Sequence, residues 1–249
     1  MRLPSASLFA SAIASLAAVG CSTIDSEDIE TSGINASMEV LRSVDGSNVS
    51  VSLAAGTLNF VSLNNGDVLK ASANEQVVEL GENNVLNAIS YFGRLDANTT
   101  GDEITVSFER ADKTPAPSST VTLPAAVEIT APAASSVFSR ANDPIVVDFT
   151  SEESADGVRL AWSGDCVEAD GIDIPAGQLT ATINAGTIQQ REQGGEEDPA
   201  EGAEAPANLE SCTMQLKIER RVTGSLDAAF KGGGISAVAV SSRDVTSNL

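Results

Sequence analysis

Apolar side chains occupy every second position through most of this chain. Val49, Val51 and Leu53 alternate with serines, and residues 103–108 repeat the pattern. Successive side chains of a β-strand point to opposite faces, so each such segment has one apolar face to bury. Helical periodicity is almost absent, and turn residues recur at a spacing of roughly 8–12 residues. We therefore predict an all-β protein whose sheets pack face to face as sandwiches.

The alternating segments fall into two blocks, residues 34–112 and residues 121–249. Between them, residues 113–120 (KTPAPSST) contain two prolines separated by one residue, which favours an extended and stiff connection. We expect two tandem β-sandwich domains of immunoglobulin-like or fibronectin-like architecture, joined by this linker. The resemblance is architectural and rests on no signature motif, so it says little about function.

An acidic stretch of low complexity, residues 189–211, interrupts the second block. It is rich in Glu, Gly and Ala and has no large apolar residue before Leu209. Ordering such a segment costs conformational entropy that burial cannot offset. We expect a disordered acidic loop between two strands.

The first 20 residues have the layout of an export signal. Arg2 is the single early cation, and residues 8–19 form an apolar run interrupted only by two serines. The run is shorter than the roughly 20 apolar residues that span a bilayer. Gly20 is small, as a cleavage site requires. Residues 1–20 are therefore predicted to be a signal peptide.

The signal ends at a lone cysteine. The segment LAAVGC, residues 16–21, resembles the lipobox of bacterial lipoproteins, in which the cysteine thiol receives a diacylglycerol thioether before the chain is cut and acylated there. The resemblance implies that Cys21 is lipidated and anchors the protein to a membrane of the cell envelope. Ser22, which is not aspartate, resembles the outer-membrane sorting form. Ala18 departs from the leucine that is commonest in this family.

Several acyl chains on one residue would hold the protein firmly, because each buried CH₂ contributes about 0.8 kcal/mol and one chain alone holds only marginally. Residues 21–33 have too few apolar residues to fold alone, so we expect a lipidated flexible tether there. The alternative is an ordinary secreted protein with an incidental cysteine at its cleavage site.

Two further cysteines, Cys166 and Cys212, complete the three in the chain. An even pair in an oxidising compartment is expected to form a disulfide. The bond would close a loop of about 47 residues and constrain the unfolded state by about 4 kcal/mol. The alternative, two reduced cysteines that hold a metal, lacks further ligands.

The chain is strongly acidic and contains no histidine. Its formal net charge is −21, which repels nucleic acid and anionic headgroups and makes both poor partners. The lack of histidine removes Ser-His-Asp and Cys-His catalysis and the usual zinc ligand sets. Any enzyme built from this chain would depend on carboxylates, lysine, tyrosine or serine.

The acidic residues suggest a cation site and a catalytic site. Residues 165–173 (DCVEADGID) carry closely spaced carboxylates of the kind that calcium binds, although the EF-hand spacing is absent. The alternative is a solvated acidic loop beside the disulfide. A carboxylate-dependent hydrolase would need two acids about 5–10 Å apart in a cleft, and no pair stands out among 35 acidic residues. The calcium candidates are Asp165, Glu168, Asp170 and Asp173.

Glycan binding would need exposed aromatic rings, because sugars stack on such surfaces. The chain has one Trp and one Tyr. Trp162 is in phase with the apolar residues Val158 and Leu160, which predicts a core position. Of the neighbours Tyr91 and Phe92, we expect one to point outward, where it could contact a ligand.

The sequence thus predicts a non-catalytic lipoprotein, anchored in the outer membrane, that acts as a structural or interaction module. Its partners would be the membrane and envelope proteins or glycans, and not nucleic acid. A lipoprotein that captures calcium or a glycan is the alternative, and a carboxylate-based hydrolase is the second alternative. Calcium is the only cofactor that the sequence suggests.

Overall fold

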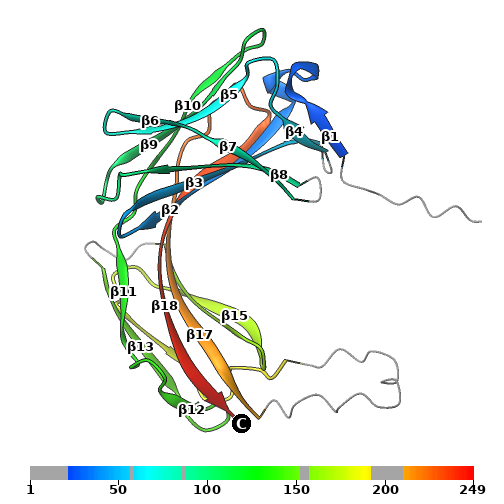
Figure 1. Ribbon diagram of the computed structural model, residues 1–249. Coiled ribbons are helices and arrows are strands. Elements are labelled where there is room, and N and C mark those ends of the chain that lie inside the picture. Colours follow the sequence, from blue (N-terminus) through cyan, green and yellow to red (C-terminus); the bar gives the residue numbers. More distant parts are fainter. Residues whose placement is uncertain (1–21, 57–58, 86–87, 152–156, 192–209) are drawn as a thin grey trace, which may run out of the picture.

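The computed structural model describes residues 22–56, 59–85, 88–151, 157–191 and 210–249. Within these ranges the chain forms β-strands and two short 3₁₀ turns and has no α-helix, which confirms the all-β prediction (Figure 1). A search of the same ranges finds no helix with the length and apolar character needed to span a membrane. The predicted signal peptide, Cys21 and most of the acidic stretch at 189–211 lie outside the described residues.

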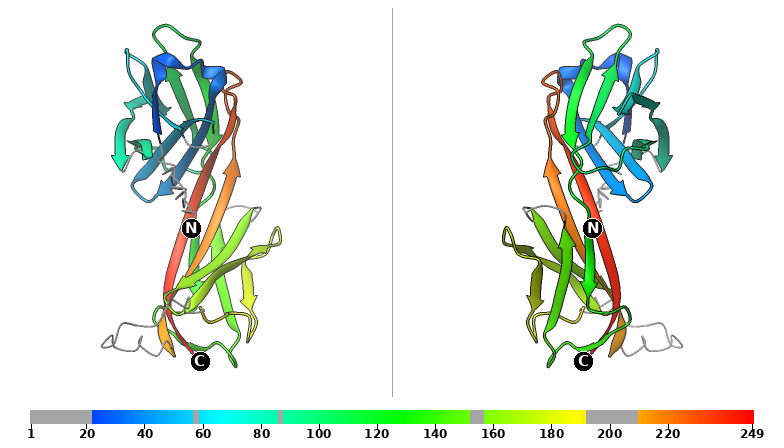
Figure 2. Two further views of the ribbon diagram at one scale, coloured as in Figure 1. Left: turned by 90° about the vertical axis from the view of Figure 1, so that its right-hand side faces the viewer. Right: turned by 90° about the vertical axis from the view of Figure 1, so that its left-hand side faces the viewer.

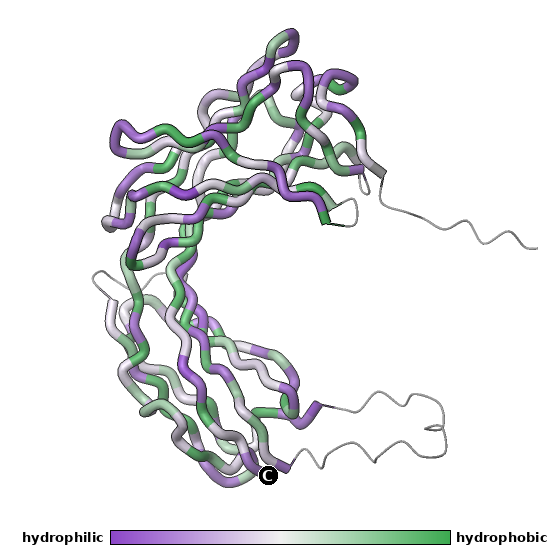
Figure 3. The backbone as a smooth tube through the Cα atoms, in the orientation of Figure 1, coloured by the Kyte–Doolittle hydropathy of each residue, from purple (hydrophilic) through white to green (hydrophobic). Residues whose placement is uncertain are grey.

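Alternation along the strands determines which faces are buried. In strand β9 (Glu103–Glu109), Ile104, Val106 and Phe108 are fully buried, and the residues between them are partly exposed. Figure 3 shows the alternation of apolar and polar residues along many of the strands. Burial of such a face contributes about 25 cal/mol per Å² of apolar surface removed from water. This contribution favours pairs of sheets packed face to face.

The first half of the molecule is a sandwich of two sheets around one core. Its strands, besides β9, are β1 (Ser22–Asp25), β2 (Ile34–Ser43), β3 (Gly46–Ala55), β4 (Asn59–Ser62), β5 (Val68–Ala73), β6 (Gln76–Glu79), β7 (Gly81–Val85), β8 (Ala88–Leu95) and β10 (Ala116–Thr122). One sheet contains β1, β4, β3 and β2 in that order, with the β7–β8 hairpin beside β3, and the other has the order β10-β9-β5-β6. Leu53, Tyr91 and Phe108 lie in the core between them. Two 3₁₀ turns, η1 (Ser26–Asp28) and η2 (Thr31–Gly33), connect β1 to β2.

The second half is a smaller sandwich with its own core. Its strands are β11 (Val127–Ala131), β12 (Val137–Ser139), β13 (Ile145–Ser151), β14 (Val158–Gly164), β15 (Val167–Ile174), β16 (Thr180–Ile183), β17 (Ser211–Thr223) and β18 (Gly232–Asn248). A sheet of order β11-β13-β16 faces the sheet that contains β18, β17, β14 and β15. Phe149, Trp162 and Leu216 pack in the core between these sheets.

Strands β17 and β18 run through both halves. Strand β17 pairs antiparallel with β18 along its whole length, from Ser211 opposite Asn248 to Thr223 opposite Ser236. The first residues of β18 pair in parallel with β2, whereas β17 pairs with β14 in the second half. One continuous sheet therefore joins the halves, and Figures 1 and 2 show β17 and β18 as the shared spine of a curved molecule.

Glycine allows β18 to approach β2 at the start of this spine. Gly233 has a φ of +113°, and a Cβ atom there would lie 1.9 Å from the carbonyl oxygen of Ala36. No other residue tolerates both the backbone conformation and the contact. Of the glycines 232–234, Gly233 is thus a requirement of the parallel β2–β18 pairing.

The structure corrects the prediction of a flexible tether over residues 21–33. The part that it describes, from residue 22 onward, belongs to the first sandwich, because β1 pairs in parallel with β4. Ile24 and Ile29 pack against the core, and Ser26 and Thr31 are fully buried. Local composition cannot reveal these contacts, since their partners lie far away in the sequence.

The structure also corrects the prediction that residues 113–120 form a linker between two domains. Most of this segment forms β10, which pairs antiparallel with β9 in the first sandwich. The connection from β10 to the second half is instead residues 123–126. A proline-rich composition is compatible with an edge strand, because an edge leaves one row of backbone groups unpaired.

The boundaries 34–112 and 121–249 therefore do not divide the structure into its two halves. The core of the first half extends on β18 to Ala237, and that of the second half begins with Ala239. Because β17 and β18 supply residues to both cores, no single cut of the chain separates the sandwiches.

Candidate functional site

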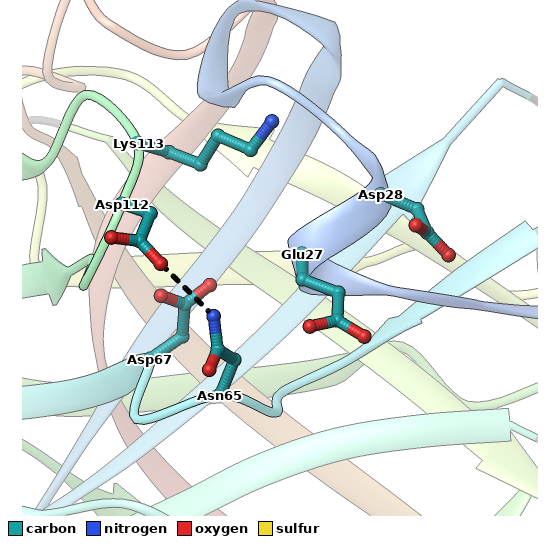
Figure 4. A pocket seen from close by; sticks show the side chains of 6 residues that line it. All are labelled: Glu27, Asp28, Asn65, Asp67, Asp112 and Lys113. Carbon is teal, nitrogen blue, oxygen red and sulfur yellow. Dashed lines mark hydrogen bonds between the residues drawn. The ribbon is translucent and has the colours of Figure 1, made fainter.

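A polar pocket of about 290 Å³ opens beside the two 3₁₀ turns of the first half. Figure 4 shows its six lining side chains, which come from η1, from the β4–β5 turn and from the segment after β9. They are Glu27, Asp28, Asn65, Asp67, Asp112 and Lys113. Segments far apart in sequence thus meet at this one place.

The β4–β5 turn has the local chemistry that its sequence predicts. Residues 63–67 (LNNGD) are typical of a turn, because Asn and Gly tolerate positive φ. Asn65 and Gly66 have φ values of +51° and +80°, and the Asp67 N–H donates to the carbonyl oxygen of Asn64 at 2.9 Å. The turn places Asp67 immediately before the first residue of β5.

Asp67, one of the residues that line the pocket, belongs to a buried ion pair. Arg110 Nε lies 2.8 Å from Asp67 Oδ2, and the two side chains are 0% and 4% exposed. The second carboxylate oxygen of Asp67 accepts the Ala111 N–H at 3.0 Å. The guanidinium also lies over the Phe108 ring, 4.7 Å from its centroid. Both charges are therefore compensated although both are removed from water.

The remaining donors of Arg110 hold the N-terminal segment. They reach the Ser26 carbonyl oxygen at 2.5 Å, the Ile29 carbonyl oxygen at 3.1 Å and Thr31 Oγ1 at 3.0 Å. Hydrogen bonds that involve a charged group contribute more than neutral ones, about 1.5–3 kcal/mol each. We call this set of residues, with Asp67, the Arg110 clamp.

Further contacts reinforce the clamp. The Ser26 hydroxyl donates to Asn64 Oδ1 at 2.9 Å and accepts the Asn64 N–H at 3.1 Å. The Thr31 hydroxyl donates to the Thr114 carbonyl oxygen. At the rim, Lys113 Nζ forms an ion pair with Glu30 Oε1 at 2.8 Å. Side chains on both sides of the pocket thus fasten η1 and η2 to the sandwich.

Asp67 fastens a chain segment and is not free for acid–base chemistry. A carboxylate pair for hydrolysis needs one free acid and one free base in a cleft. Here both oxygens of Asp67 accept hydrogen bonds from Arg110 and Ala111, and Asp112 Oδ2 accepts one from Asn65 at 3.2 Å. The two other acids of the pocket, Glu27 and Asp28, are exposed on η1.

The structure does not bring the four calcium candidates together. Asp165 lies in the β14–β15 turn, and the other three are exposed along β15. Asp170 and Asp173 have opposite parity in the strand, so they point to opposite faces. Asp173 Oδ1 accepts a hydrogen bond from Arg159 at 3.0 Å. Within the described ranges, no three residues of the types His, Cys, Asp and Glu form a group that could hold a metal.

The aromatic residues are placed as the alternation predicts. Trp162 is 2% exposed, which confirms its core position, and of the neighbouring pair Tyr91 is buried and Phe92 is 46% exposed. The Tyr91 hydroxyl donates to the Val61 carbonyl oxygen at 2.8 Å and accepts the Leu63 N–H at 3.0 Å. Burial raises the pKa of Tyr91, and the nearby Glu82 carboxylate adds to this effect.

The predicted disulfide is confirmed. Cys166 and Cys212 are joined by an S–S bond of 1.98 Å, which links the β14–β15 turn to the start of β17. Arg140, which is 6% exposed, donates to Cys166 Sγ at 2.9 Å. Burial lowers the pKa of this arginine. Cys212 pairs with Ser247 near the last residue of β18, so the disulfide lies at the end of β17 and β18 opposite to the one that pairs with β2.

Sequence reasoning missed Arg110 and Asp67, although the sequence does contain a signal for both. Arg110 continues the buried phase of β9 after Ile104, Val106 and Phe108, and Asp67 precedes the buried phase of β5. A charge in phase with an apolar face indicates a buried ion pair, because an unpaired buried charge is too costly. That the two charges are partners becomes known only from the β5–β9 register, in which Val68 lies opposite Glu109.

No protein-family model and no curated protein matches this sequence. Among solved structures, it is similar to the BSP domain of a biofilm-associated protein, with 15% identity, 87% of this chain and 30% of that chain covered, and a TM-score of 0.26. It is also similar to the adhesin InvE of Yersinia pseudotuberculosis, with 11% identity, 86% and 59% coverage, and a TM-score of 0.22.

A third similarity is to the FN1–FN3 domains of chicken CNTN1, with 11% identity, 83% and 64% coverage, and a TM-score of 0.21. The chain spans less than a third of the length of the first structure, of which it covers 30%. TM-scores of 0.21 to 0.26 carry no argument about what this protein does. The functional interpretation therefore depends on the residues themselves.

Proposed function

We propose that this chain is a lipid-anchored, non-catalytic module of the bacterial cell envelope, sorted to the outer membrane through Cys21, with a structural or interaction role. The observation that carries the proposal is the Cys166–Cys212 disulfide. Disulfides form and persist outside the reducing cytosol. The chain has three cysteines, so this bond leaves Cys21, at the end of the lipobox-like segment, as the only one without a disulfide partner.

The architecture supports a structural or interaction role. Two sandwiches share β17 and β18, and a spine of paired strands resists bending better than a flexible linker does. Asp67, which lines the polar pocket of the first half, bonds to the arginine that fastens the chain, and the aromatic residues Trp162 and Tyr91 are buried. The described residues thus supply a rigid body with broad sheet surfaces for partners.

The experiment that tests the anchor is a measurement of intact mass after expression of the full chain in a bacterium that processes lipoproteins. We expect the mature protein to begin at Cys21, to carry the mass of a diacylglycerol and an acyl chain, and to partition into a detergent phase. Cys21→Ser is the matched control and should remain in the aqueous phase. A wild-type protein that is cleaved but unlipidated would contradict the proposal.

A second measurement separates this proposal from its alternatives. Calorimetric titration of the purified protein with calcium, together with a glycan array, should give no saturable binding. Saturable calcium binding that is lost in Asp170→Asn would favour the ligand-capturing alternative. Hydrolysis of a defined glycoside by the purified chain would favour the hydrolase.

A further inference from the structure

Strand β1 begins with Ser22, the residue that follows the proposed lipidation site. Strand β1 pairs in parallel with β4 from Ser22 opposite Asn59 to Asp25 opposite Ser62. Consecutive Cα atoms are about 3.8 Å apart. Cys21 is therefore one peptide unit away from a residue whose position in the sheet is fixed.

The segment that follows β1 is held by buried contacts. The Arg110 clamp binds backbone carbonyl groups of Ser26 and Ile29, and its guanidinium is fully buried against Asp67. Releasing the segment would leave two nitrogens of the buried Arg110 guanidinium without these acceptors, which is costly inside a protein. The clamp therefore holds the residues that follow β1, and β1 itself pairs with β4 from Ser22 onward, so a single peptide unit separates Cys21 from the sheet.

We propose that the first sandwich lies directly on the bilayer, with the sheet end at which β1 begins as its membrane-facing surface and the lipid headgroups as its partner. This inference rests on the proposed lipidation of Cys21. A flexible tether would let the protein turn freely above the membrane. A connection of one peptide unit fixes which end of the sheet faces the lipid.

The strand register identifies that end of the sheet. Ser22 pairs with Asn59, and Asn59 pairs with Ala55 at the end of β3. Strand β8 is antiparallel to β3, with Val51 opposite Tyr91, so the residues that precede Tyr91 run toward the same end. Figure 1 shows the start of β1, the end of β7 and the start of β8 on the same side of the first half.

Two exposed valines mark the two ends of this sheet. Val85 is 57% exposed and lies at the closed end of the β7–β8 hairpin, where it pairs with Ala88. Val44 is 88% exposed and lies in the β2–β3 turn, between Ser43 and Gly46. Along the ten residues of β3, at about 3.4 Å per residue, the two ends are roughly 30 Å apart.

Charge does not supply the contact. Asp25, Glu27 and Asp28 are exposed on the segment next to the anchor, and they repel anionic headgroups over roughly a Debye length. The short covalent connection must therefore hold the surface at the bilayer. Lengthening the connection should then release the sandwich, because no attraction remains to keep it there.

The test uses the full acylated chain in phosphatidylcholine vesicles that contain a spin-labelled headgroup lipid as a quencher. An unnatural fluorescent amino acid replaces either Val85 or Val44, so that no additional cysteine is introduced. We expect the quencher to reduce the fluorescence at position 85 several-fold more than at position 44. In a second protein, twenty Gly and Ser residues inserted between Cys21 and Ser22 give a connection of roughly 25 Å. There the difference between the two positions should disappear.

Each outcome decides between distinct claims. If intact mass shows that the chain carries no lipid, the proposed function fails and the membrane placement fails with it. If the chain is acylated but positions 85 and 44 are quenched equally, only the placement is overturned. If the difference persists after the Gly-Ser insertion, the short connection is not its cause, and the inference is also overturned.

Discussion

The two halves of this protein fasten their chain segments by different chemistry. In the first half, the buried Arg110–Asp67 pair holds the segment between β1 and β2 against the sandwich. In the second half, the Cys166–Cys212 disulfide ties the β14–β15 turn to β17, with Arg140 beside the sulfur. Both devices join segments that are distant in sequence.

Because of this difference, we expect the stability of the two halves to depend on different conditions. A disulfide is sensitive to reductants, whereas a buried ion pair is not. A buried ion pair is strongly destabilised when one partner is removed, because the other charge remains buried. The chain has one Tyr and one Trp, and Tyr91 lies in the first core and Trp162 in the second. Each half therefore carries its own optical probe.

The largest effect is expected from Arg110→Met. This substitution leaves the Asp67 carboxylate, which is 4% exposed, without its cation. The loss of one partner of a buried ion pair costs roughly 3–5 kcal/mol. We expect the urea midpoint followed by the near-ultraviolet signal of Tyr91 to fall, and hydrogen exchange in residues 22–31 to accelerate.

The matched control is Lys70→Met on the neighbouring strand β5. Lys70 forms an ion pair with Glu109 at 2.5 Å, but the two side chains are 31% and 53% exposed. An exposed pair contributes about 0–1 kcal/mol. If Arg110→Met is no more destabilising than Lys70→Met, the clamp does not stabilise the first half, and the contrast between the two halves is lost.

The second effect concerns the disulfide. Replacing both Cys166 and Cys212 by alanine is expected to cost about 2–4 kcal/mol, since the unfolded chain is no longer constrained by a loop. Trp162 fluorescence should report unfolding at a lower urea concentration, and the Tyr91 signal should shift less. Equal shifts at both probes would show instead that β17 and β18 couple the halves into one cooperative unit.

The sequence predicts the class of fold well because its signal is local. Alternation in segments such as residues 103–108 identifies the strands and their buried faces, and the phase of Trp162 correctly predicts a core position. The disulfide was also predictable, because the sequence predicts an exported chain, in which the two cysteines that remain after Cys21 are expected to be oxidised.

The candidate site and the division of the chain could not be predicted, because they depend on pairing between distant segments. Residues 22–33 are polar, and only Arg110 and β4 show why they are ordered. Residues 113–120 contain prolines, and only the β9–β10 register shows that they form an edge strand. Composition indicates whether a segment can fold by itself. These segments are instead stabilised by contacts with distant partners, which the local sequence does not reveal.

The smallest effect is expected at Tyr91. Its hydroxyl donates to the Val61 carbonyl oxygen and accepts the Leu63 N–H. Tyr91→Phe leaves both of these backbone groups without their side-chain partner, at a cost of about 1–3 kcal/mol. At neutral pH we therefore expect a modest decrease in the urea midpoint, measured by far-ultraviolet circular dichroism because the substitution removes the tyrosine signal.

The same residue makes the first half sensitive to alkali. Burial raises the pKa of Tyr91 in the folded protein, so the folded state favours the neutral phenol. Its contribution to stability is complete below the pKa of a free tyrosine, about 10, and declines as the pH rises above that value. Between pH 8 and pH 11 the wild-type midpoint should fall further than that of Tyr91→Phe, which has no phenol to ionise. An equal decrease in both proteins would mean that other groups, such as the lysines, cause the alkaline loss, and Tyr91 would then not distinguish the first half from the second.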